Sequence, residues 1–258
     1  MKDDHGETGA SGHLHKRSVS CENCPLRRLP TFRPFTPEEL KFVSRFKLGE
    51  LTLGAGQTLL YEGEASPHLY TLLSGWMYRH KSLPDGRRQI LNYLLPGDFV
   101  GMQAAVLKEM EHTVEALTAV RLCVFPREKL WSLYSTQPGL GFDLTWLVSR
   151  EVKMLDDHLL SIGRRSALER MAYLMLHLYR RARDLGLLDG AGFELPLNQR
   201  HVADTLGLSI VHTNKTLRKL YDHGVISWKQ RILVVLQEGE LAKIARFEDG
   251  SKQLRPFI

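Results

Sequence analysis

Glycines recur at nearly regular intervals in the first half of the chain. Gly63, Gly75, Gly86 and Gly97 are 12, 11 and 11 residues apart, with short apolar runs between them. Short strands joined by turns at this spacing are typical of an all-β sandwich or barrel. A helix would have to hold these glycines in its interior, at a cost of about 1 kcal/mol each. The stretch from about residue 48 to 135 is therefore predicted to be β-structure.

After Pro138 the glycine spacing disappears, and residues 139–162 are predicted to form one long helix. Its apolar positions are spaced 4, 3, 4 and 3 residues apart, which is a heptad seam. The seam consists of Val148, Val152, Leu155, Leu159 and Ile162. Such a stripe can pair with a second copy of the chain, or it can be the apolar face of a core helix in a monomer. We expect a homodimer held by this helix.

Three further helices are each preceded by a residue that can cap an N-terminus. Thr36 is followed by a proline at the first helical position, and Ser166 is followed by Glu169 at the capping-box position. Asn198 precedes a short helix that ends near Leu206. These signals predict helices that begin directly after each cap.

The last third of the chain contains two short helices joined by a tight turn. Residues 198–206 form the first helix, 207–209 the turn and 210–222 the second helix. This arrangement is a helix-turn-helix, and residues 225–228 and 231–235 are predicted to follow it as a β-hairpin wing. The pattern favours DNA binding, with the second helix in the major groove.

The second helix carries polar and basic side chains that can reach base edges and phosphates. Lys215 and Arg218 are the first choices for phosphate or guanine contacts. The full set expected to contact DNA is Ser209, Val211, His212, Thr213, Asn214, Lys215, Arg218, Lys219, Lys229 and Arg231. The alternative is that the helix-turn-helix binds another protein, and the salt dependence of DNA affinity distinguishes the two.

The excess positive charge of the chain lies in the same third. Residues 161–258 contain 16 lysines and arginines against 10 acidic residues, a net charge of +6, whereas residues 1–160 are neutral overall. A basic domain beside a neutral one indicates a polyanionic partner. A solvated basic face is the other interpretation, and charge alone does not separate them.

The chain contains three cysteines, Cys21, Cys24 and Cys123. An odd and sparse set is not a disulfide scaffold. In a reducing compartment, the Cys21-x-x-Cys24 pair favours a metal site, a cluster or a redox pair. Ordinary reduced thiols are the fourth interpretation, and all four stay open.

Several functional classes are not expected. No stretch approaches the ~18 apolar residues of a membrane span, and the N-terminus lacks the apolar core of a signal peptide, so a cytoplasmic protein is expected. We find no glycine-rich phosphate loop, no Gly-x-Ser-x-Gly and no His-Glu-x-x-His. An enzyme is therefore not expected.

The order of β-roll, long helix and winged helix-turn-helix resembles the CRP/FNR superfamily of bacterial transcription regulators. The resemblance covers about residues 20–240. It is carried by residues 56–64, 69–75, 95–101, 125–127 and 206–209. It implies a homodimer that binds a palindromic operator in double-stranded DNA, at the nucleoid, and that works with RNA polymerase, as an activator does.

The cyclic-AMP-binding members of this superfamily carry a Gly-Glu pair and, about ten residues later, an Arg-Ser or Arg-Thr pair. In this sequence, Gly101-Met102 and His112-Thr113 stand at those places. Methionine cannot accept a hydrogen bond from a ribose hydroxyl as a carboxylate does, and a neutral histidine replaces a bidentate arginine poorly. Cyclic AMP is therefore disfavoured, and the four residues remain candidates for the pocket of another small effector.

The cysteines resemble those of the oxygen-sensing FNR branch, in which they bind an iron–sulfur cluster. Cys21, Cys24 and Cys123 match three of the four ligand positions, whereas Pro30 occupies the fourth and cannot ligate. The resemblance implies that these cysteines are the sensor and the metal ligands, with a histidine of the N-terminus or an exogenous ligand as the fourth.

The recognition helix also departs from the FNR branch, which usually shows Glu, Ser and Arg there. Val211, Asn214 and Lys215 stand at those positions. The target sequence of that branch is therefore not expected for this chain.

Together these observations predict an α+β protein in five parts. They are a disordered tail over 1–20, a jelly-roll sensor domain of the cyclic-nucleotide-binding type over 21–137, a dimerisation helix over 138–163, a winged helix-turn-helix domain over 164–240 and a C-terminal tail over 241–258.

Overall fold

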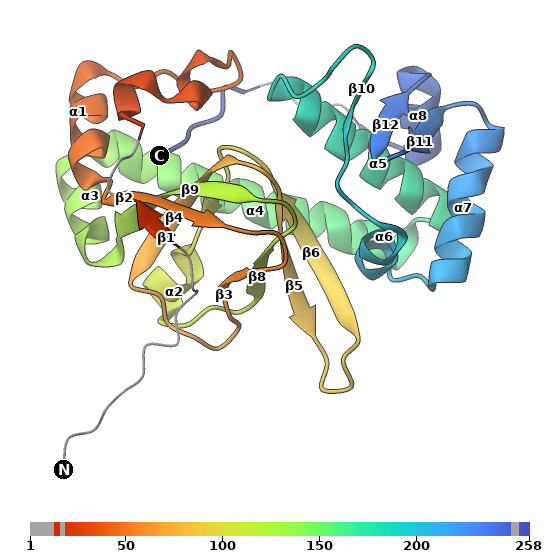
Figure 1. Cartoon of the computed structure of the whole chain (residues 1–258), viewed down its shortest axis with the longest axis horizontal. Helices are drawn as coiled ribbons and strands as arrows, with labels where there is room; N and C mark the ends of the chain where they lie inside the picture. The colour runs from red at the N-terminus through yellow and green to blue at the C-terminus, as the bar shows by residue number, and fades with distance from the viewer. Residues whose placement is uncertain (1–12, 16–18, 249–252) are drawn as a thin grey trace.

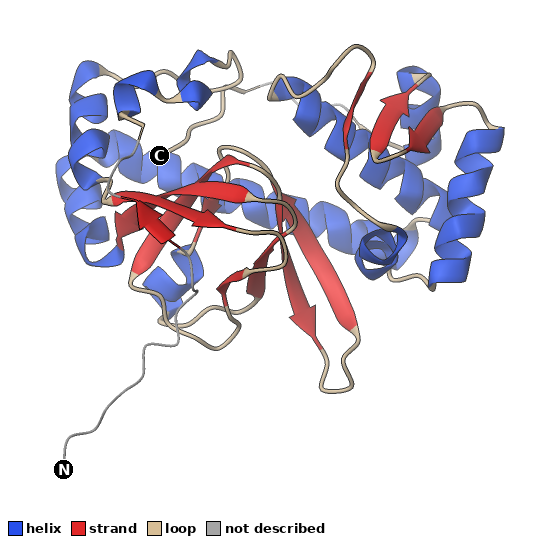
Figure 2. Ribbon diagram, viewed as in Figure 1, coloured by secondary structure: helices blue, strands red, loops and turns tan. Residues whose placement is uncertain are grey.

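A computed structural model describes residues 13–15, 19–248 and 253–258. Figure 1 shows a β-rich part and a mainly helical part, with one long helix behind both. Figure 2 shows most strands gathered in the first part and helices in both parts. The predicted α+β architecture is confirmed.

The β-roll consists of two antiparallel sheets packed face to face. The strand order is β1-β2-β9-β4-β7 in one sheet and β3-β8-β5-β6 in the other. The strands are β1 (His13–His15), β2 (Gly49–Leu53), β3 (Thr58–Leu60), β4 (His68–Ser74), β5 (Met77–Ser82), β6 (Arg88–Leu94), β7 (Phe99–Val100), β8 (Thr113–Ala116) and β9 (Val120–Pro126). Leucines and valines of both sheets fill the space between them, among them Leu72, Val114 and Leu122, which are fully buried.

Two of the regularly spaced glycines occupy positions that a side chain would disturb. Gly75 has φ +86°, and an added Cβ would lie 2.3 Å from the Ala119 carbonyl oxygen. Gly97 also has φ +86°, and its Cβ would lie 2.4 Å from the ring of Phe32. Both turns therefore depend on glycine for conformation and for space.

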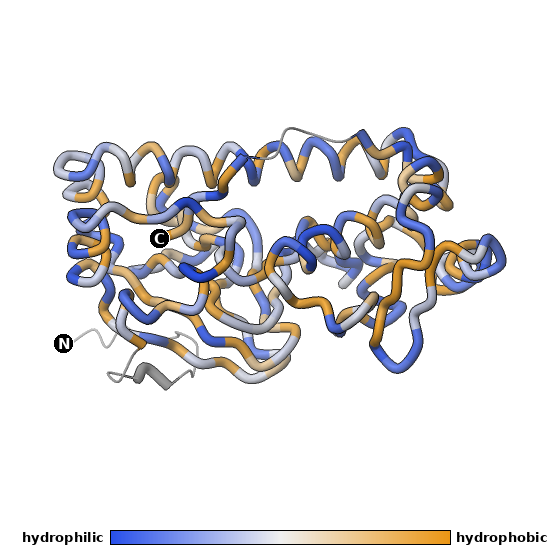
Figure 3. The backbone as a smooth tube through the Cα atoms, turned by 90° about the horizontal axis from the view of Figure 1, so that it is seen from above, coloured by the Kyte–Doolittle hydropathy of each residue, from blue (hydrophilic) through white to orange (hydrophobic). Residues whose placement is uncertain are grey.

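Short helices lie before, within and after the β-roll in sequence, and the long helix α4 follows them. Thr36 caps α1 in a complete capping box with Glu39, as its sequence predicts. These elements are η1 (Cys21–Asn23), η2 (Pro25–Arg28), α1 (Pro37–Phe46), α2 (Met102–Leu107), η3 (Arg127–Lys129), α3 (Leu130–Thr136) and α4 (Pro138–Arg164). Figure 3 shows α4 along one side of the molecule, past both the β-roll and the helical part.

The helical part is a winged helix-turn-helix domain. Its elements are α5 (Ala167–Asp184), β10 (Gly192–Glu194), α6 (Gln199–Leu206), α7 (Ile210–Asp222), β11 (Ile226–Lys229), β12 (Ile232–Val235) and α8 (Glu238–Ala245). Ser166 caps α5 and Asn198 caps α6, both in capping boxes. Gly207 ends α6 in the left-handed conformation, which confirms the predicted tight turn.

The structure differs from the predicted tails at both ends. His13–His15 is a strand that pairs with β2, whereas residues 1–12 and 16–18 lie outside the described part of the chain. At the other end, Leu241 and Ala245 of α8 are fully buried, and Phe257 and Ile258 are 4% and 3% exposed. The predicted C-terminal tail is thus corrected, because its apolar residues pack against the core.

Candidate DNA-interaction surface and sensor sites

Helix α7 presents one polar face to solvent. Ser209 caps it by accepting a hydrogen bond from the His212 N–H at 3.2 Å. Leu217 and Leu220 point inward and are buried. The exposed residues of its first three turns are Ile210, Val211, His212, Asn214, Lys215, Arg218 and Lys219. This face carries three cations and no carboxylate, as a surface for base edges and phosphates requires.

Thr213 was predicted to contact DNA, but the structure places it on the buried face of α7. It is 1% exposed, and its hydroxyl has no hydrogen-bond partner among the described residues. The cause is helical periodicity, because positions 213, 216, 217 and 220 share the inward face of α7. Thr213 therefore belongs to the packing of the domain.

The wing places two more cations beside α7. Gln230 and Arg231 form the two-residue turn between β11 and β12, with φ values of +50° and +66°. Positive φ at both positions is the geometry of a type I′ hairpin. Lys229 and Arg231 are both exposed. The predicted hairpin is confirmed, but its turn lies one residue later than expected.

An open groove of about 440 Å³ lies between the start of α6, α7 and the wing. Arg200 and Arg231 line it, together with the aromatic side chains of Tyr221 and Trp228. Sequence reasoning missed Arg200, Tyr221 and Trp228. Arg200 follows the predicted N-cap Asn198 by two residues, in the first turn of a helix, where the backbone N–H groups favour anions.

The expected dimerisation seam is largely uncovered in the single chain. Val148, Val152 and Leu159 are 36%, 53% and 66% exposed. Leu155 and Ile162 are half-buried. Two apolar residues of α4 that the seam did not include, Phe142 and Leu160, are also exposed, at 70% and 51%. An apolar stripe of this length on one helix is typical of an interaction surface.

The structure brings the three cysteines together. Cys21 lies in η1, Cys24 joins η1 to η2, and Cys123 lies behind them on β9. The pKa of Cys123 is raised to about 12, mainly by burial; the Lys47 ammonium acts to lower it, and Cys21 and Cys24 act to raise it. Burial also raises the pKa of Cys24. The buried thiol of Cys123 is therefore protonated at neutral pH.

A buried ion pair anchors the segment that carries these cysteines. The Lys47 ammonium lies 2.8 Å from the Glu50 carboxylate, with side chains 6% and 4% exposed. The Lys47 ammonium also donates to the Val19 carbonyl at 2.9 Å, and the Val19 N–H donates to Glu50 at 2.9 Å. The chain is thus fixed to β2 two residues before Cys21.

The residues described do not fit the iron–sulfur cluster that the resemblance implies. No group of three or more His, Cys, Asp or Glu side chains in the described part of the chain is placed to hold a metal ion. Pro30 occupies the remaining ligand position.

A cavity of about 290 Å³ lies between the β-roll and α4. Gly101, Met102 and His112 line it, as the sequence predicted, but Thr113 does not. The Thr113 hydroxyl instead accepts a hydrogen bond from the Glu62 N–H at 3.2 Å. Burial lowers the pKa of His112 to about 3, so its ring is neutral.

Arg79 gives the same cavity a cationic wall. It is 4% exposed and forms an ion pair with Glu151 of α4. It also donates to the Phe99 carbonyl at 2.9 Å. Its Nε and the Nε2 of His112 are buried without partners among the described residues. The cavity is therefore lined mainly by apolar side chains, with one buried cation and one neutral histidine among them.

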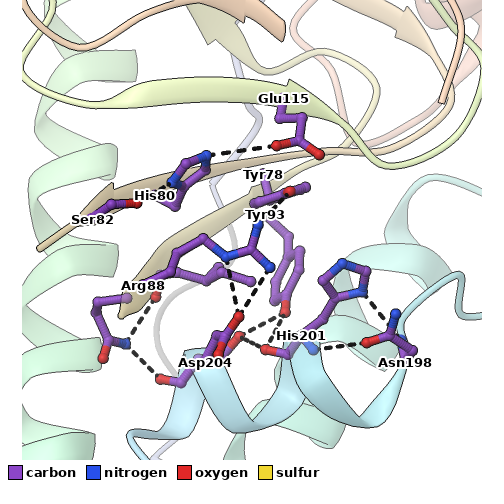
Figure 4. A network of polar contacts seen from close by, with 12 residues as sticks. Tyr78, His80, Ser82, Arg88, Tyr93, Glu115, Asn198, His201 and Asp204 are labelled. Atoms are coloured by element: carbon purple, nitrogen blue, oxygen red, sulfur yellow. Dashed lines mark hydrogen bonds and ion pairs between the residues drawn. The ribbon is translucent and has the colours of Figure 1, made fainter. Parts of the chain in front are cut away.

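The helix-turn-helix domain is docked onto the β5–β6 hairpin (Figure 4). Arg88 donates to the Asp204 carboxylate at 2.9 Å, and Gln89 donates to the Thr205 carbonyl at 2.9 Å. The hydroxyls of Tyr93 and Thr205 lie 2.6 Å apart. These contacts link β6 to α6, so the sensor and DNA-binding domains touch directly.

A second junction is centred on Asp98, directly before β7. Its carboxylate lies 2.5 Å from Arg181 of α5 and 3.7 Å from Arg150 of α4, and it pairs with Arg255 near the C-terminus. It also accepts the Leu95 N–H at 2.7 Å. Burial raises the pKa of Asp98, but the three arginines outweigh it and lower the pKa overall. One carboxylate thus joins four parts of the chain.

The fold and its surfaces define a DNA-binding protein with an attached sensor domain. Residues 50–137 match the cyclic nucleotide-binding domain family, and residues 169–244 match the Crp-like helix-turn-helix domain family. The chain belongs to the CRP/FNR family of transcription regulators, on its FNR-like branch, and it is a DNA-binding transcription regulator.

Relatives of known function support this family membership. The nitrogen fixation regulation protein FixK of Bradyrhizobium diazoefficiens is 33% identical, over 80% of this chain and 86% of its own length. The transcriptional activator protein FnrL of Cereibacter sphaeroides is 28% identical, over 84% and 88%. The structure of FixK2 from Bradyrhizobium japonicum superposes with a TM-score of 0.70 at 25% identity, covering 78% of this chain and 98% of FixK2. Among the described helices, none is long and apolar enough to cross a membrane.

Proposed function

We propose that two copies of this chain pair along α4 and insert α7 of each copy into successive major-groove half-sites of a palindromic operator. The exposed cationic face of α7 is the observation that carries this proposal. A two-fold dimer demands half-sites about 34 Å apart, which is one turn of DNA. Regulation of transcription with RNA polymerase in the cytoplasm, and not catalysis, is the function that follows.

Replacing Lys215 or Arg218 with alanine is expected to weaken operator binding by about 1–3 kcal/mol, or roughly 5- to 150-fold in Kd. No described carboxylate pairs with either cation, so both are available for DNA. A variant that loses a phosphate contact also loses about one unit of salt slope. Mobility-shift titrations at several salt concentrations measure both quantities.

Lys243→Ala is the matched control for this experiment. Lys243 is an exposed lysine of α8, outside α7 and the wing, and it pairs with Glu240 at 2.6 Å. Its loss removes the same charge and is expected to leave operator affinity nearly unchanged. If Lys215→Ala and Arg218→Ala both bound the operator as tightly as Lys243→Ala and the parent chain, α7 would not be the DNA-reading helix.

Thiol oxidation at Cys21 and Cys24 is the proposed input signal. A peroxide takes two electrons and two protons from the two thiols, one S–S bond forms between them, and the peroxide is reduced to water. Support comes from the half-buried positions of the two cysteines. Val19, two residues before Cys21, is held by the Lys47–Glu50 ion pair, so a new bond would form in a segment that is fixed at one end. Oxidation can shift the equilibrium between two conformations of the protein only by as much as the disulfide stabilises one conformation over the other.

Hydrogen peroxide is expected to change the operator Kd of the parent chain about 5-fold or more, reversibly with dithiothreitol. Cys21→Ser removes one partner and is expected to abolish the response. Cys123→Ser is the control that keeps it, because the Cys123 thiol is 7% exposed and its pKa is raised to about 12. Mass spectrometry of the treated protein identifies the bonded pair. A full response in Cys21→Ser would contradict the thiol input.

The cavity beside α4 is a second candidate for the input. The Arg79 cation among its mainly apolar lining residues favours a small effector that is largely apolar and carries a hydrogen-bond acceptor. Val148 and Val152 of the dimerisation seam also line it, so an occupant would act on helix pairing. A response to small cell-extract molecules that survives replacement of all three cysteines would identify this cavity as the sensor.

A further inference from the structure

The described C-terminal segment, Gln253–Ile258, returns from the helical domain to the β-roll. Figure 1 shows the C-terminus above the β-roll, on the side of α1 and away from α8. Residues 255–258 are all buried there. A segment that follows the DNA-binding domain in sequence is therefore part of the sensor domain in space.

Backbone hydrogen bonds fix the register of this segment. The Arg255 N–H donates to the Thr31 carbonyl at 2.8 Å, and the Arg33 N–H donates to the Arg255 carbonyl at 2.8 Å. Phe32 and Arg255 form a parallel β-bridge. The Thr71 hydroxyl of β4 donates to the Ile258 carbonyl. The segment is thus held as an added short strand, in the manner of a bound peptide.

Two alternate side chains anchor the segment more deeply. The Phe257 ring lies 4.9 Å from the ring of Phe32 and 4.9 Å from that of Phe35. The Arg255 guanidinium pairs with the Asp98 carboxylate and stands 5.3 Å over the Phe32 ring. Both anchors are buried, with Arg255 6% and Phe257 4% exposed. An aromatic in a pocket and a desolvated ion pair are the anchors typical of a specific interface.

We propose that residues 254–258 are an intramolecular peptide ligand, a latch that holds the DNA-binding domain to a groove on the sensor domain. The groove is formed by residues 31–35, Thr71 and Asp98. The segment 31–35 follows η1 and η2, and Cys21 and Cys24 lie at the two ends of η1, so a rearrangement there is expected to change the groove. Asp98 binds the latch through Arg255 and the DNA-binding domain through Arg181. The groove is therefore connected to the cysteine segment through residues 31–35, and to the DNA-binding domain through the Asp98–Arg181 ion pair.

The latch is tested by supplying it as a separate peptide. A chain that ends at Gln253 is expected to bind a fluorescent Leu-Arg-Pro-Phe-Ile peptide saturably, as measured by anisotropy. The parent chain is expected to bind it at least about 10-fold more weakly, because its own segment fills the groove. Peptides with alanine in place of Arg255 or Phe257 are also expected to bind at least about 10-fold more weakly. No saturable binding to a folded truncated chain at about 1 mM peptide would overturn the proposal.

A measurement on the full chain guards against a truncated variant that does not fold. The Arg33 amide is expected to exchange with deuterium at least about 10-fold faster in Phe257→Ala than in the parent chain. The Lys47 amide, which is bonded to Val43 in α1, is the internal reference and should not change. Equal exchange of Arg33 in both proteins would overturn the latch. Neither experiment uses DNA, so its result is independent of the proposed operator binding.

Discussion

Asp98→Asn is expected to lower the free energy of unfolding by about 3–5 kcal/mol. The carboxylate is 5% exposed and pairs with three arginines, of which Arg181 and Arg255 are also buried. An amide keeps the shape of the side chain but leaves these guanidinium charges without a counter-charge. Urea denaturation at pH 7, followed by circular dichroism, measures the loss.

The pH dependence of this difference follows from the lowered pKa of Asp98. A carboxyl group with a depressed pKa in the folded state contributes stability that is fully present above its unfolded pKa, near 3.9. That contribution is lost as the pH falls through the folded-state pKa. The gap between the parent chain and Asp98→Asn should therefore be constant above about pH 5 and shrink in acid.

Asp85→Asn is the control for the removal of a paired carboxylate at the surface. Its side chain is 52% exposed, and it pairs with Arg87 in the β5–β6 turn. Exposed pairs of this kind contribute about 0–1 kcal/mol. If Asp98→Asn were no more destabilising than Asp85→Asn, the Asp98 junction would not hold the domains together.

Local signals in the sequence were sufficient to predict most helices and strands. Caps at Thr36, Ser166 and Asn198 fixed three helix starts, because a side-chain acceptor two or three residues before an N–H needs no tertiary partner. The helix-turn-helix and its wing were predicted for the same reason. Thr213 shows the limit of residue type alone, because the packing of α7 decided which polar side chains face outward.

Contacts between residues distant in sequence could not be predicted from local patterns. The C-terminal segment has too few residues to show a period, and its structure depends on Phe32, Phe35 and Thr71. Arg88 gives no sign in the sequence that Asp204 lies opposite it, 116 residues later. Cys123 was associated with Cys21 and Cys24 through the family resemblance, whereas its raised pKa follows from burial, which only the fold determines.

The double variant Val152→Asp/Leu159→Asp is expected to be monomeric and to lose operator affinity more than about 100-fold. Each side chain is more than half exposed in the single chain, so charge there leaves the folded monomer intact. In a dimer along α4 the same positions are covered, and burial of each apolar side chain is worth about 1.5–3 kcal/mol. A carboxylate in that interface also carries a desolvation cost.

Sedimentation velocity over a range of concentrations measures the change in assembly, and Leu83→Asp is its control. Leu83 is 53% exposed in the β5–β6 turn, so the control makes the same kind of substitution outside α4. A monomer reaches one half-site and loses the affinity that the second half-site adds through effective concentration. Loss of operator affinity in a variant that still sediments as a dimer would assign α4 to signal transmission. An unchanged dimer with unchanged affinity would place the subunit contact on another surface, because the apolar stripe of α4 would then be unnecessary for both properties.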